Sequence, residues 1–521
     1  MKIGGSRATT YILLAILITA AILRFNQINQ PFIDVTSWRQ SDTATIADNF
    51  YQGHWNIFYP KISWNGPGDN YVGYEFQTIT YIAALLYRII GHHDWVARSV
   101  AVTFGVWGIF AFYQLVRRIW SEKHALISAA LLAILPGQIY VDRSFLPDPV
   151  MLSLVVTSVW LMVAFLQTER LHYLILSSLT GLLGFLTKIS GIFVGIAMLY
   201  AIVTILRQKQ KLRSKQLAVI GAAAVAVLSL VIAYYLWAIH ISKTYPPYYI
   251  AAGGYWVWKF GLRHFLEQNY FLPKLYFQLD WFWTKPLILF VAIGLVLRPP
   301  QSEHQSRDSI SSAPWLFHWW IIAFAIYYLI AAQGLVNNPT NLNLINPAAA
   351  ALTSNVLIVG FSFIRRIAGF PTSLALITTL LILIIGIGQH KLKTLAFRPW
   401  AANDYQLGLA LRQISQPDDL VVTATSTTGD TVAIYYSQRD GWVFPPAYTW
   451  SSLSWSELDD EDAILLLKEL SDKGATWLGI VNKQKNQLSK EKPKLIEYME
   501  RTFEVYQKSP RFMIYHITAQ E

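Results

Sequence analysis

The chain has 521 residues, of which 54% are hydrophobic and only 14% are charged, against about 25% charged residues in an ordinary soluble protein. This composition excludes a water-soluble globule and indicates a membrane protein. Lysine and arginine exceed aspartate and glutamate by 42 − 31 = 11, and the absence of cysteine excludes disulfides, thiol catalysis and cysteine-ligated zinc.

Nearly uncharged stretches recur along the first three quarters of the chain. Each has about the length that a helix needs to cross the ~30 Å hydrocarbon core of a bilayer. The stretches are 10–26, 96–115, 124–141, 149–167, 173–187, 189–206, 216–240, 284–298, 315–335, 344–364 and 371–389. The sequence therefore predicts a polytopic α-helical membrane protein with about 11 transmembrane helices.

Basic residues lie in alternate loops between these stretches, which sets the orientation because lysine and arginine in short loops stay on the cytoplasmic side. They are Lys2, Arg7, Arg117, Arg118, Lys123, Arg170, Arg207, Lys209, Lys211, Arg213, Lys215, Arg298, Arg307, Arg365 and Arg366. We expect the N-terminus in the cytoplasm and the residues after about 389 outside it. The first stretch has one alternative, a signal peptide with Lys2 and Arg7 as its basic region.

The segment 76–90 is apolar but short, and it carries Arg88 near its end. Counting it as a transmembrane helix would move Arg117 and Arg118 to the outer side. We therefore predict that 76–90 is a helix lying at the membrane interface. It belongs to a first outer loop that runs from 27 to 95.

The last part of the chain has a different character, with more charges and short alternating segments. Strand patterns cover 420–425, 432–436, 477–481 and 512–517, and helical patterns cover 405–414 and 462–471. This alternation predicts a small C-terminal extracytoplasmic α/β domain. The predicted domains are a transmembrane domain, 1–389, and an extracytoplasmic domain, 390–521.

Ionisable residues collect in the outer loops and at the outer ends of the predicted helices, not in their middles. They are Asp34, Arg39, Asp42, Asp48, Asp69, Glu75, Asp142, Arg143, Asp148, Lys188, Lys243, Lys259, Arg263, His264 and Glu267. A flippase or transporter for a lipid-linked glycan would need charges along a path through the membrane, which makes it the less favoured alternative. Basic residues form no stripe, and no nucleic-acid partner is expected.

Several short motifs after the first predicted helix occur in a recognisable order. They are WRQSDTA at 38–44, IADNF at 46–50, GHW at 53–55, GYEF at 73–76, Arg98, RIWSEK at 118–123, FLPDP at 145–149 and LTK at 186–188. In this order the chain resembles bacterial members of the protein O-mannosyltransferase and lipid A aminoarabinose transferase superfamily. The resemblance is clearest over residues 1–210.

The resemblance implies an integral membrane glycosyltransferase of the C-type fold in the cytoplasmic membrane. Such an enzyme takes a sugar from a polyprenyl-phosphate carrier at the outer face. It gives the sugar, with inversion, to a hydroxyl of a glycolipid, an envelope polysaccharide or a protein. A polysaccharide polymerase or ligase of similar fold is the alternative within the enzymes, and an inactive scaffold is a third possibility.

The resemblance also implies roles for particular residues. Asp42 becomes the catalytic base, Asp148 the second acidic catalytic residue, and Glu75 a ligand of the acceptor or of a possible divalent cation. Lys188, Arg263 and Lys259 are expected to bind the donor phosphate. Each acidic residue has a structural alternative: an N-cap for Asp42 and Asp148, and an ordinary first-turn position for Glu75.

Three further points limit the chemistry. Lys188 has a structural alternative: its side chain only snorkels, with its charged end at the membrane interface and no phosphate bound. Phe76 stands where the aminoarabinose transferases have a basic residue, so that one phosphate contact must come from elsewhere. The sequence has no Gly-rich phosphate loop, and a nucleotide-sugar donor is disfavoured.

Overall fold

The computed structural model describes residues 7–209, 214–251, 257, 271–300, 312–335, 338–445, 455 and 458–517. Their contacts separate the chain into two units. The first, here called the helical unit, comprises Met1–Ile28, Arg98–Tyr234 and Tyr255–Ala396. The second, the α/β unit, comprises Asn29–Ala97, Tyr235–Gly254 and Phe397–Glu521.

The apolar stretches of the sequence fold as helices. These are α1 (Arg7–Phe25), α4 (Asp94–Ile119), α5 (Glu122–Ile134), α6 (Pro136–Arg143), α7 (Pro147–Thr168), α8 (Leu171–Thr187), α9 (Gly195–Gln208), α10 (Ser214–Thr244), α13 (Phe271–Trp283), α14 (Lys285–Val296), α15 (Leu316–Leu335) and α16 (Asn346–Lys391). Short 3₁₀ helices, η1 (Ile189–Val194) and η3 (Pro339–Ile345), precede α9 and α16. The predicted helical membrane fold is confirmed.

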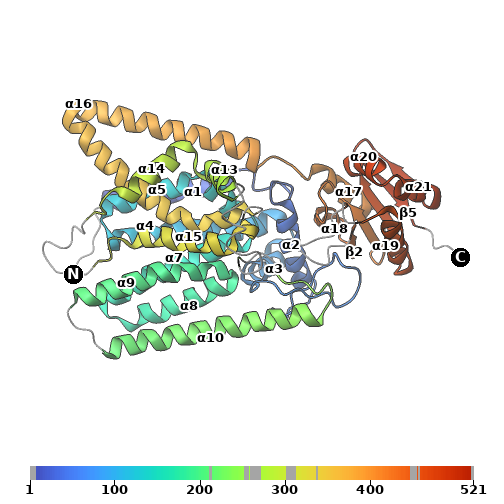
Figure 1. Cartoon of the computed structure of the whole chain (residues 1–521), viewed down its shortest axis with the longest axis horizontal. Coiled ribbons are helices and arrows are strands. Elements are labelled where there is room, and N and C mark those ends of the chain that lie inside the picture. Colours follow the sequence, from blue (N-terminus) through green and yellow to red (C-terminus); the bar gives the residue numbers. More distant parts are fainter. Residues whose placement is uncertain are drawn as a thin grey trace. The chain divides into compact units, whose positions relative to one another are not determined.

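Length and composition qualify six helical segments of the described chain as membrane spans, or up to eight if each of two bent pairs counts as one span. Three further apolar helices of the described chain are shorter: Thr78–Ile90, Leu171–Thr187 and Leu316–Ala332. Helix α16 covers two of the predicted spans, 344–364 and 371–389. Its backbone leaves the helical conformation between them, at Gly369, two residues before Pro371. Figure 1 shows the two arms of α16 diverging at a sharp bend.

The predicted span 124–141 is not one straight helix. Helices α5 and α6 meet at 66°. Pro136 disfavours the helical conformation at Leu135, whose ψ of 122° is extended, and then begins α6. The predicted span 284–298 is likewise one arm of a bent pair, α13 and α14, which meet at 106°.

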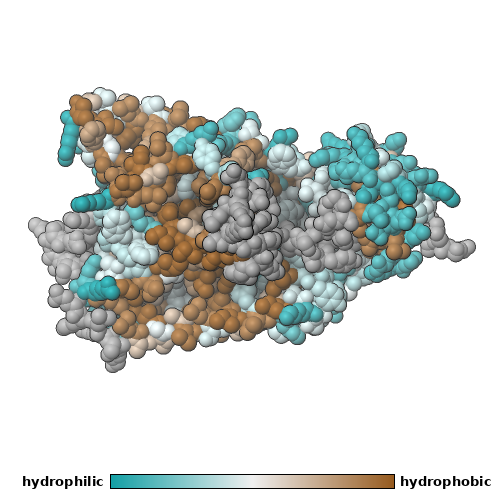
Figure 2. Space-filling model, in the orientation of Figure 1, coloured by the Kyte–Doolittle hydropathy of each residue, from teal (hydrophilic) through white to brown (hydrophobic). Residues whose placement is uncertain are grey.

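Helix α7 lies at the centre of the helical unit, with 89% of its apolar window buried, whereas only 11% of the window of α1 is buried. Small residues let α8 approach α7 closely. A Cβ on Gly184 would lie 2.9 Å from the side chain of Val155, and one on Gly181 would lie 2.8 Å from Ser158 Oγ. The outer surface of the helical unit is largely hydrophobic, as Figure 2 shows and as a membrane protein requires.

A five-stranded sheet forms the centre of the C-terminal domain, in the order β2–β1–β3–β5–β4. The strands are β1 (Leu420–Ala424), β2 (Gly441–Val443), β3 (Ala475–Val481), β4 (Glu504–Lys508) and β5 (Phe512–His516). Strand β1 pairs in parallel with β2 and β3, while β5 is antiparallel to β3 and β4. The helices are α17 (Ala402–Ile414), α18 (Val432–Ser437), α19 (Asp460–Asp472), α20 (Asn482–Glu491) and α21 (Pro493–Thr502).

The predicted α/β character of this domain is confirmed, but the strand predicted at 432–436 is wrong. The segment forms the short helix α18. The Asp430 carboxylate accepts a hydrogen bond from Val432 N at 2.9 Å, and such a side-chain contact favours a helical turn over a strand. The place beside β1 is taken instead by β2.

The two faces of the sheet carry different layers. Apolar residues of α19, α20 and α21 cover one face, together with Val422, Leu478 and Tyr515 of the sheet. The other face packs against α17 and α18. The same apolar cluster includes Ile46 and Phe50 from the first predicted loop, whose helices are α2 (Ser37–Tyr51) and α3 (Thr78–Ile90). The first loop therefore shares a hydrophobic core with the C-terminal sheet.

Candidate active site

Helix α2 carries the main acidic motif and is unusual because it is polar and yet buried. Twelve of its fifteen residues are buried, although its sequence is SWRQSDTATIADNFY. The helix begins at Ser37 after the N-cap Thr36, so that Asp42 lies in its second turn. The alternative of Asp42 as a helix N-cap is therefore wrong.

The Asp42 carboxylate is surrounded by hydrogen-bond donors. Trp64 Nε1 donates to Oδ1 at 2.9 Å, and the Tyr74 hydroxyl donates to Oδ2 at 2.5 Å. Arg39, one turn earlier on α2, donates through Nη1 to Oδ2 at 2.8 Å. Only 4% of the Asp42 side chain is exposed, and both of its oxygens thus have fixed partners.

Arg39 joins Asp42 to the second predicted acidic residue of the loop. Its Nη2 donates to Glu75 Oε2 at 2.8 Å, and its guanidinium carbon lies 4.5 Å from the centre of the Tyr74 ring. Burial tends to lower the pKa of Arg39, but the negative charges of Glu75 and Asp42 raise it well above its ordinary value. Burial, followed by the Asp42 charge, raises the pKa of Tyr74. Arg39 is therefore a permanent cation held by two carboxylates.

Tyr74 is placed by backbone pairing with the segment that follows α10. Gly73 N donates to Tyr249 O at 2.8 Å, and Ala251 N donates to Gly73 O at 3.1 Å. A Cβ on Gly73 would lie 2.4 Å from Ala238 O, so that only glycine fits this close approach. The Tyr249 ring then meets the Tyr74 ring edge-on, with 5.4 Å between centroids.

The C-terminal domain fixes α2 from its other side. Ser37 Oγ donates to Asp430 Oδ2 at 3.1 Å, and the hydroxyls of Ser41 and Thr431 lie 2.8 Å apart. Burial, followed by the nearby charge of Asp404, raises the pKa of Asp430 to about 7. The polar face of α2 thus finds its hydrogen-bond partners in the domain that sequence analysis treated as separate.

The segment carrying Trp64 is also attached to this domain. Gly66 N donates to Gly441 O at 2.6 Å, and Gly441 N donates to Ser63 O at 3.0 Å. Trp442 covers Gly66 so closely that a Cβ there would lie 2.4 Å from the indole ring. Both α2 and the loop that carries Trp64 are therefore held by the C-terminal domain.

Asp148 and Lys188 form a second charged site, in the helical unit. Lys188 Nζ lies 2.8 Å from Asp148 Oδ1 and 2.9 Å from Oδ2. Asp148 is in the first turn of α7, but the N-cap is Leu146 and has no side-chain capping bond. The N-cap alternative for Asp148 is therefore wrong, and its carboxylate is occupied by Lys188, of which 16% is exposed.

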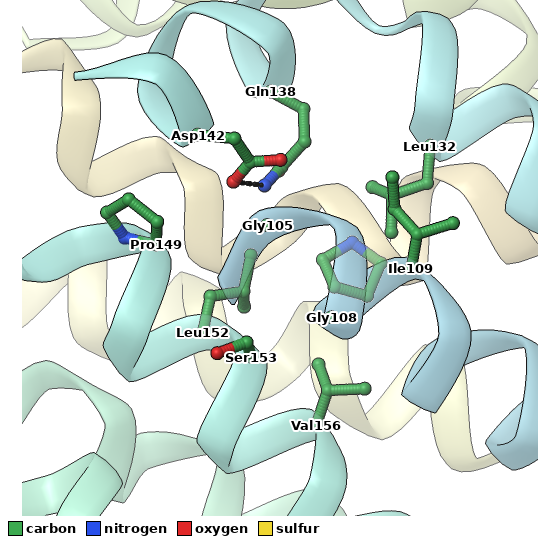
Figure 3. Close-up of a pocket in the computed structure, with 11 residues that line it drawn as sticks. Gly105, Gly108, Ile109, Leu132, Gln138, Asp142, Pro149, Leu152, Ser153 and Val156 are labelled. Atoms are coloured by element: carbon green, nitrogen blue, oxygen red, sulfur yellow. Dashed lines mark hydrogen bonds between the residues drawn. The ribbon is translucent and has the colours of Figure 1, made fainter. Parts of the chain in front are cut away.

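A third ion pair is fully buried in the same unit. Arg24 Nε, near the end of α1, lies 2.8 Å from Asp142 Oδ2, and Gln138 Nε2 donates to Oδ1 at 2.7 Å. Asp142 and Gln138 border a small pocket together with Gly105 and Ser153 (Figure 3). Every hydrogen-bonding oxygen of Asp142 is occupied, which indicates a structural role in joining α1 to α6.

The structure thus brings the predicted residues together in two groups. Asp42 and Glu75 are joined through Arg39, and Asp148 is joined to Lys188. Lys259 and Arg263 lie outside the described residues. Sequence reasoning did not assign roles to Arg39, Trp64 or Tyr74. The spacing of three residues between Arg39 and Asp42 was a usable signal, because such pairs face each other on a helix.

Comparison with known proteins agrees with this architecture. Residues 78–253 match the family model of dolichyl-phosphate-mannose-protein mannosyltransferases. ArnT from Cupriavidus metallidurans, solved bound to undecaprenyl phosphate, superimposes with a TM-score of 0.62 at 12% identity, over 98% of this chain and 99% of that chain. The chain has the fold of the C-type glycosyltransferases. The predicted C-type fold is therefore confirmed.

A second solved C-type structure is equally similar over this chain. The archaeal oligosaccharyltransferase AglB from Archaeoglobus fulgidus, in complex with an inhibitory peptide and a dolichol-phosphate, gives a TM-score of 0.61 at 13% identity. The match covers 99% of this chain and 75% of that chain. No curated protein sequence matches the chain significantly. The C-type fold makes this chain a multi-pass membrane protein.

Proposed function

We propose that this protein transfers a sugar from a polyprenyl-phosphate carrier to an acceptor hydroxyl, with inversion at the anomeric carbon. The observation that carries the proposal is the chain-long similarity to a C-type enzyme solved with undecaprenyl phosphate. The acceptor is a glycolipid, an envelope polysaccharide or a protein. The reaction takes place at the outer face of the cytoplasmic membrane, with the N-terminus inside and the C-terminal domain outside.

Asp42 is proposed as the base of this reaction. As the acceptor oxygen attacks the anomeric carbon, its proton passes to the Asp42 carboxylate. The bond from that carbon to the phosphate oxygen breaks, and its electron pair stays on the leaving polyprenyl phosphate. A single displacement of this kind inverts the anomeric configuration. The buried, fixed carboxylate found at Asp42 suits this role because it is held in one orientation by three donors.

Lys188 is proposed to bind the carrier phosphate, with Asp148 as the residue that positions its ammonium group. A developing negative charge on the leaving phosphate is stabilised by a nearby cation. Lys188 is partly exposed, so that a phosphate can share its charge with Asp148. Arg263 and Lys259 are proposed to contribute further phosphate contacts, on the basis of the motif resemblance.

The proposal is tested with the full chain reconstituted in lipid nanodiscs. The nanodiscs are incubated with labelled undecaprenyl-phosphate hexoses and pentoses, and with envelope extract as the source of acceptors. We expect one donor to be consumed with release of undecaprenyl phosphate, and the Asp42→Asn variant to lose transfer by about 10²-fold or more. The matched control is Asp418→Asn, at an exposed turn of the C-terminal domain.

Two outcomes would count against the proposal. Transfer by Asp42→Asn at nearly the wild-type rate would show that the base is misassigned, and consumption of none of the donors would contradict a carrier-dependent transfer. The phosphate site is tested separately by native mass spectrometry with undecaprenyl phosphate alone. Lys188→Gln should weaken this binding, while Lys490→Gln, on the exposed surface of α20, should leave it unchanged.

A further inference from the structure

We infer that the guanidinium of Arg39 takes the place of a divalent cation between Asp42 and Glu75, so that this carboxylate pair works without a metal. The inference deepens the proposed function, since it concerns the same acidic site. It is carried by a geometry that links both carboxylates to one side chain. Arg39 Nη1 lies 2.8 Å from Asp42 Oδ2, and Nη2 lies 2.8 Å from Glu75 Oε2.

A guanidinium suits this place because its two terminal nitrogens donate in one plane and in fixed directions. Each nitrogen serves one carboxylate, and the group stays charged over the whole physiological pH range. The two negative charges are therefore drawn toward one positive centre. A bound divalent cation would hold two carboxylates in the same manner, but it would have to be acquired from solution.

The residues at this position do not suit a divalent metal. Mg²⁺ requires a near-octahedral set of oxygens at about 2.0–2.1 Å. Here both oxygens of Asp42 already accept hydrogen bonds, from Trp64 on one side and from Tyr74 and Arg39 on the other. Among the residues that the structure describes, no three of the types His, Cys, Asp and Glu come close enough to hold an ion. A metal between the carboxylates would also meet the positive charge of Arg39.

The Arg39 guanidinium is accessible to a ligand. The Arg39 side chain is 17% exposed and Glu75 is 16% exposed, whereas Asp42 is 4% exposed. Two of the five N–H groups of Arg39 serve the carboxylates, and the described part of the chain offers no hydrogen-bond acceptor to the other three. These N–H groups are therefore available to an oxygen of the substrate, as a metal's open coordination positions would be.

Asp148, in the helical unit, is likewise paired with a cation of the chain. Lys188 contacts both oxygens of Asp148, so that this carboxylate also has a cation from the chain itself. A monovalent ammonium held by one carboxylate leaves little net negative charge to attract a divalent ion. Both acidic groups thus carry their own counter-charge.

The first test measures metal binding directly and does not depend on activity. The full chain in phosphatidylcholine nanodiscs is titrated with Mn²⁺, and bound Mn²⁺ is measured by electron paramagnetic resonance. We expect the wild type to bind no more Mn²⁺ than the double variant Asp42→Asn with Glu75→Gln. One equivalent of Mn²⁺ that is bound by the wild type and lost in the double variant would overturn the inference.

The second test uses the donor identified for the proposed function. Wild-type transfer should be unchanged by a chelator, and Arg39→Ala should lose about 10²-fold or more in transfer. Low millimolar guanidinium should restore part of the activity of Arg39→Ala but none of that of Asp42→Asn. Loss of wild-type transfer on chelation, recovery of Arg39→Ala by Mn²⁺, or no recovery by guanidinium would each overturn the inference.

The two tests separate this inference from the proposed function. Absence of transfer with every donor would refute the proposed function and leave the Mn²⁺ titration to decide the role of Arg39. If Arg39→Ala fails to fold, which thermal unfolding would show, the titration of the wild type decides alone. A metal bound at Asp42 and Glu75 in an active enzyme would refute the inference and leave the proposed function standing.

Discussion

Replacing Gly66 by alanine tests whether the C-terminal domain holds the loop that carries Trp64. Gly66 has a φ of 80°, and an added Cβ would lie 2.4–2.8 Å from three atoms of the Trp442 indole. Contacts under 3.0 Å are essentially absent for real Cβ atoms. The indole is buried and belongs to the core on one face of the sheet, so that it has little room to move away.

Two terms make up the expected cost of Gly66→Ala. A non-glycine residue at positive φ costs about 1–3 kcal/mol. Forcing extra volume into a packed core costs about 1–3 kcal/mol more. Gly68→Ala is the matched control, because Gly68 also has a positive φ, of 110°, but has nothing within 4 Å of an added Cβ. The difference between the two variants isolates the clash with Trp442.

The assay is native-state hydrogen exchange of the Gly441 amide, which donates to Ser63 O across the contact. The clash should lower the protection of this amide in Gly66→Ala by about 5- to 150-fold relative to Gly68→Ala, since about 1.4 kcal/mol corresponds to a factor of ten. Combining Gly66→Ala with Trp442→Leu should recover much of this difference. Equal protection in Gly66→Ala and Gly68→Ala would refute the reasoning.

Three other predictions concern single charged or hydroxyl groups. The raised pKa of Asp430 makes a contribution to the stability of the α/β unit that is complete below the ordinary pKa of 3.8 and is lost as the pH rises through about 7. The variant Asp430→Asn should therefore flatten the pH dependence of thermal unfolding. An unchanged pH profile would contradict this. Arg24→Leu should destabilise the helical unit by roughly 3–5 kcal/mol, because it leaves Asp142 buried without its cation. Adding Asp142→Asn to this variant should restore part of the thermal stability. No recovery in the double variant would count against the ion pair. Tyr74→Phe should lower kcat for transfer more than Trp64→Phe does, and equal losses in the two variants would rule out a special role for the hydroxyl.

The membrane part of the fold could be predicted from sequence because its signal is local. A run of uncharged residues has to be a helix in hydrocarbon, whatever its neighbours are. The bend at Leu135 followed from Pro136, and it was missed because the hydropathy of 124–141 continues across it. The strand predicted at 432–436 failed for the opposite reason, since its alternation is short and a single carboxylate at Asp430 decided the local conformation.

The site could be predicted only in part because its geometry is made by residues far apart in the chain. The motif order pointed to Asp42, Glu75, Asp148 and Lys188, and the spacing of Arg39 and Asp42 on one helix was visible. The sequence did not show that α2 is buried, because its polar residues would normally lie in water. They are buried because partners such as Asp430 and Thr431, almost four hundred residues later, supply the hydrogen bonds.

In the proposed reaction, the three donors around Asp42 would limit how the carboxylate accepts a proton. Trp64 is the donor to Oδ1 and can only donate, so that a proton arriving at Oδ1 would meet the indole hydrogen. The Tyr74 hydroxyl is different, because it can turn from donor to acceptor and so keep a hydrogen bond to a protonated carboxyl group. Oδ2, on the side of Tyr74, is therefore the oxygen that can receive the acceptor's proton with the least loss of hydrogen bonding. Arg39 also donates to Oδ2 and cannot accept, so that in the proposed reaction it would have to give up this bond, and its link to Glu75 then leaves it a second carboxylate.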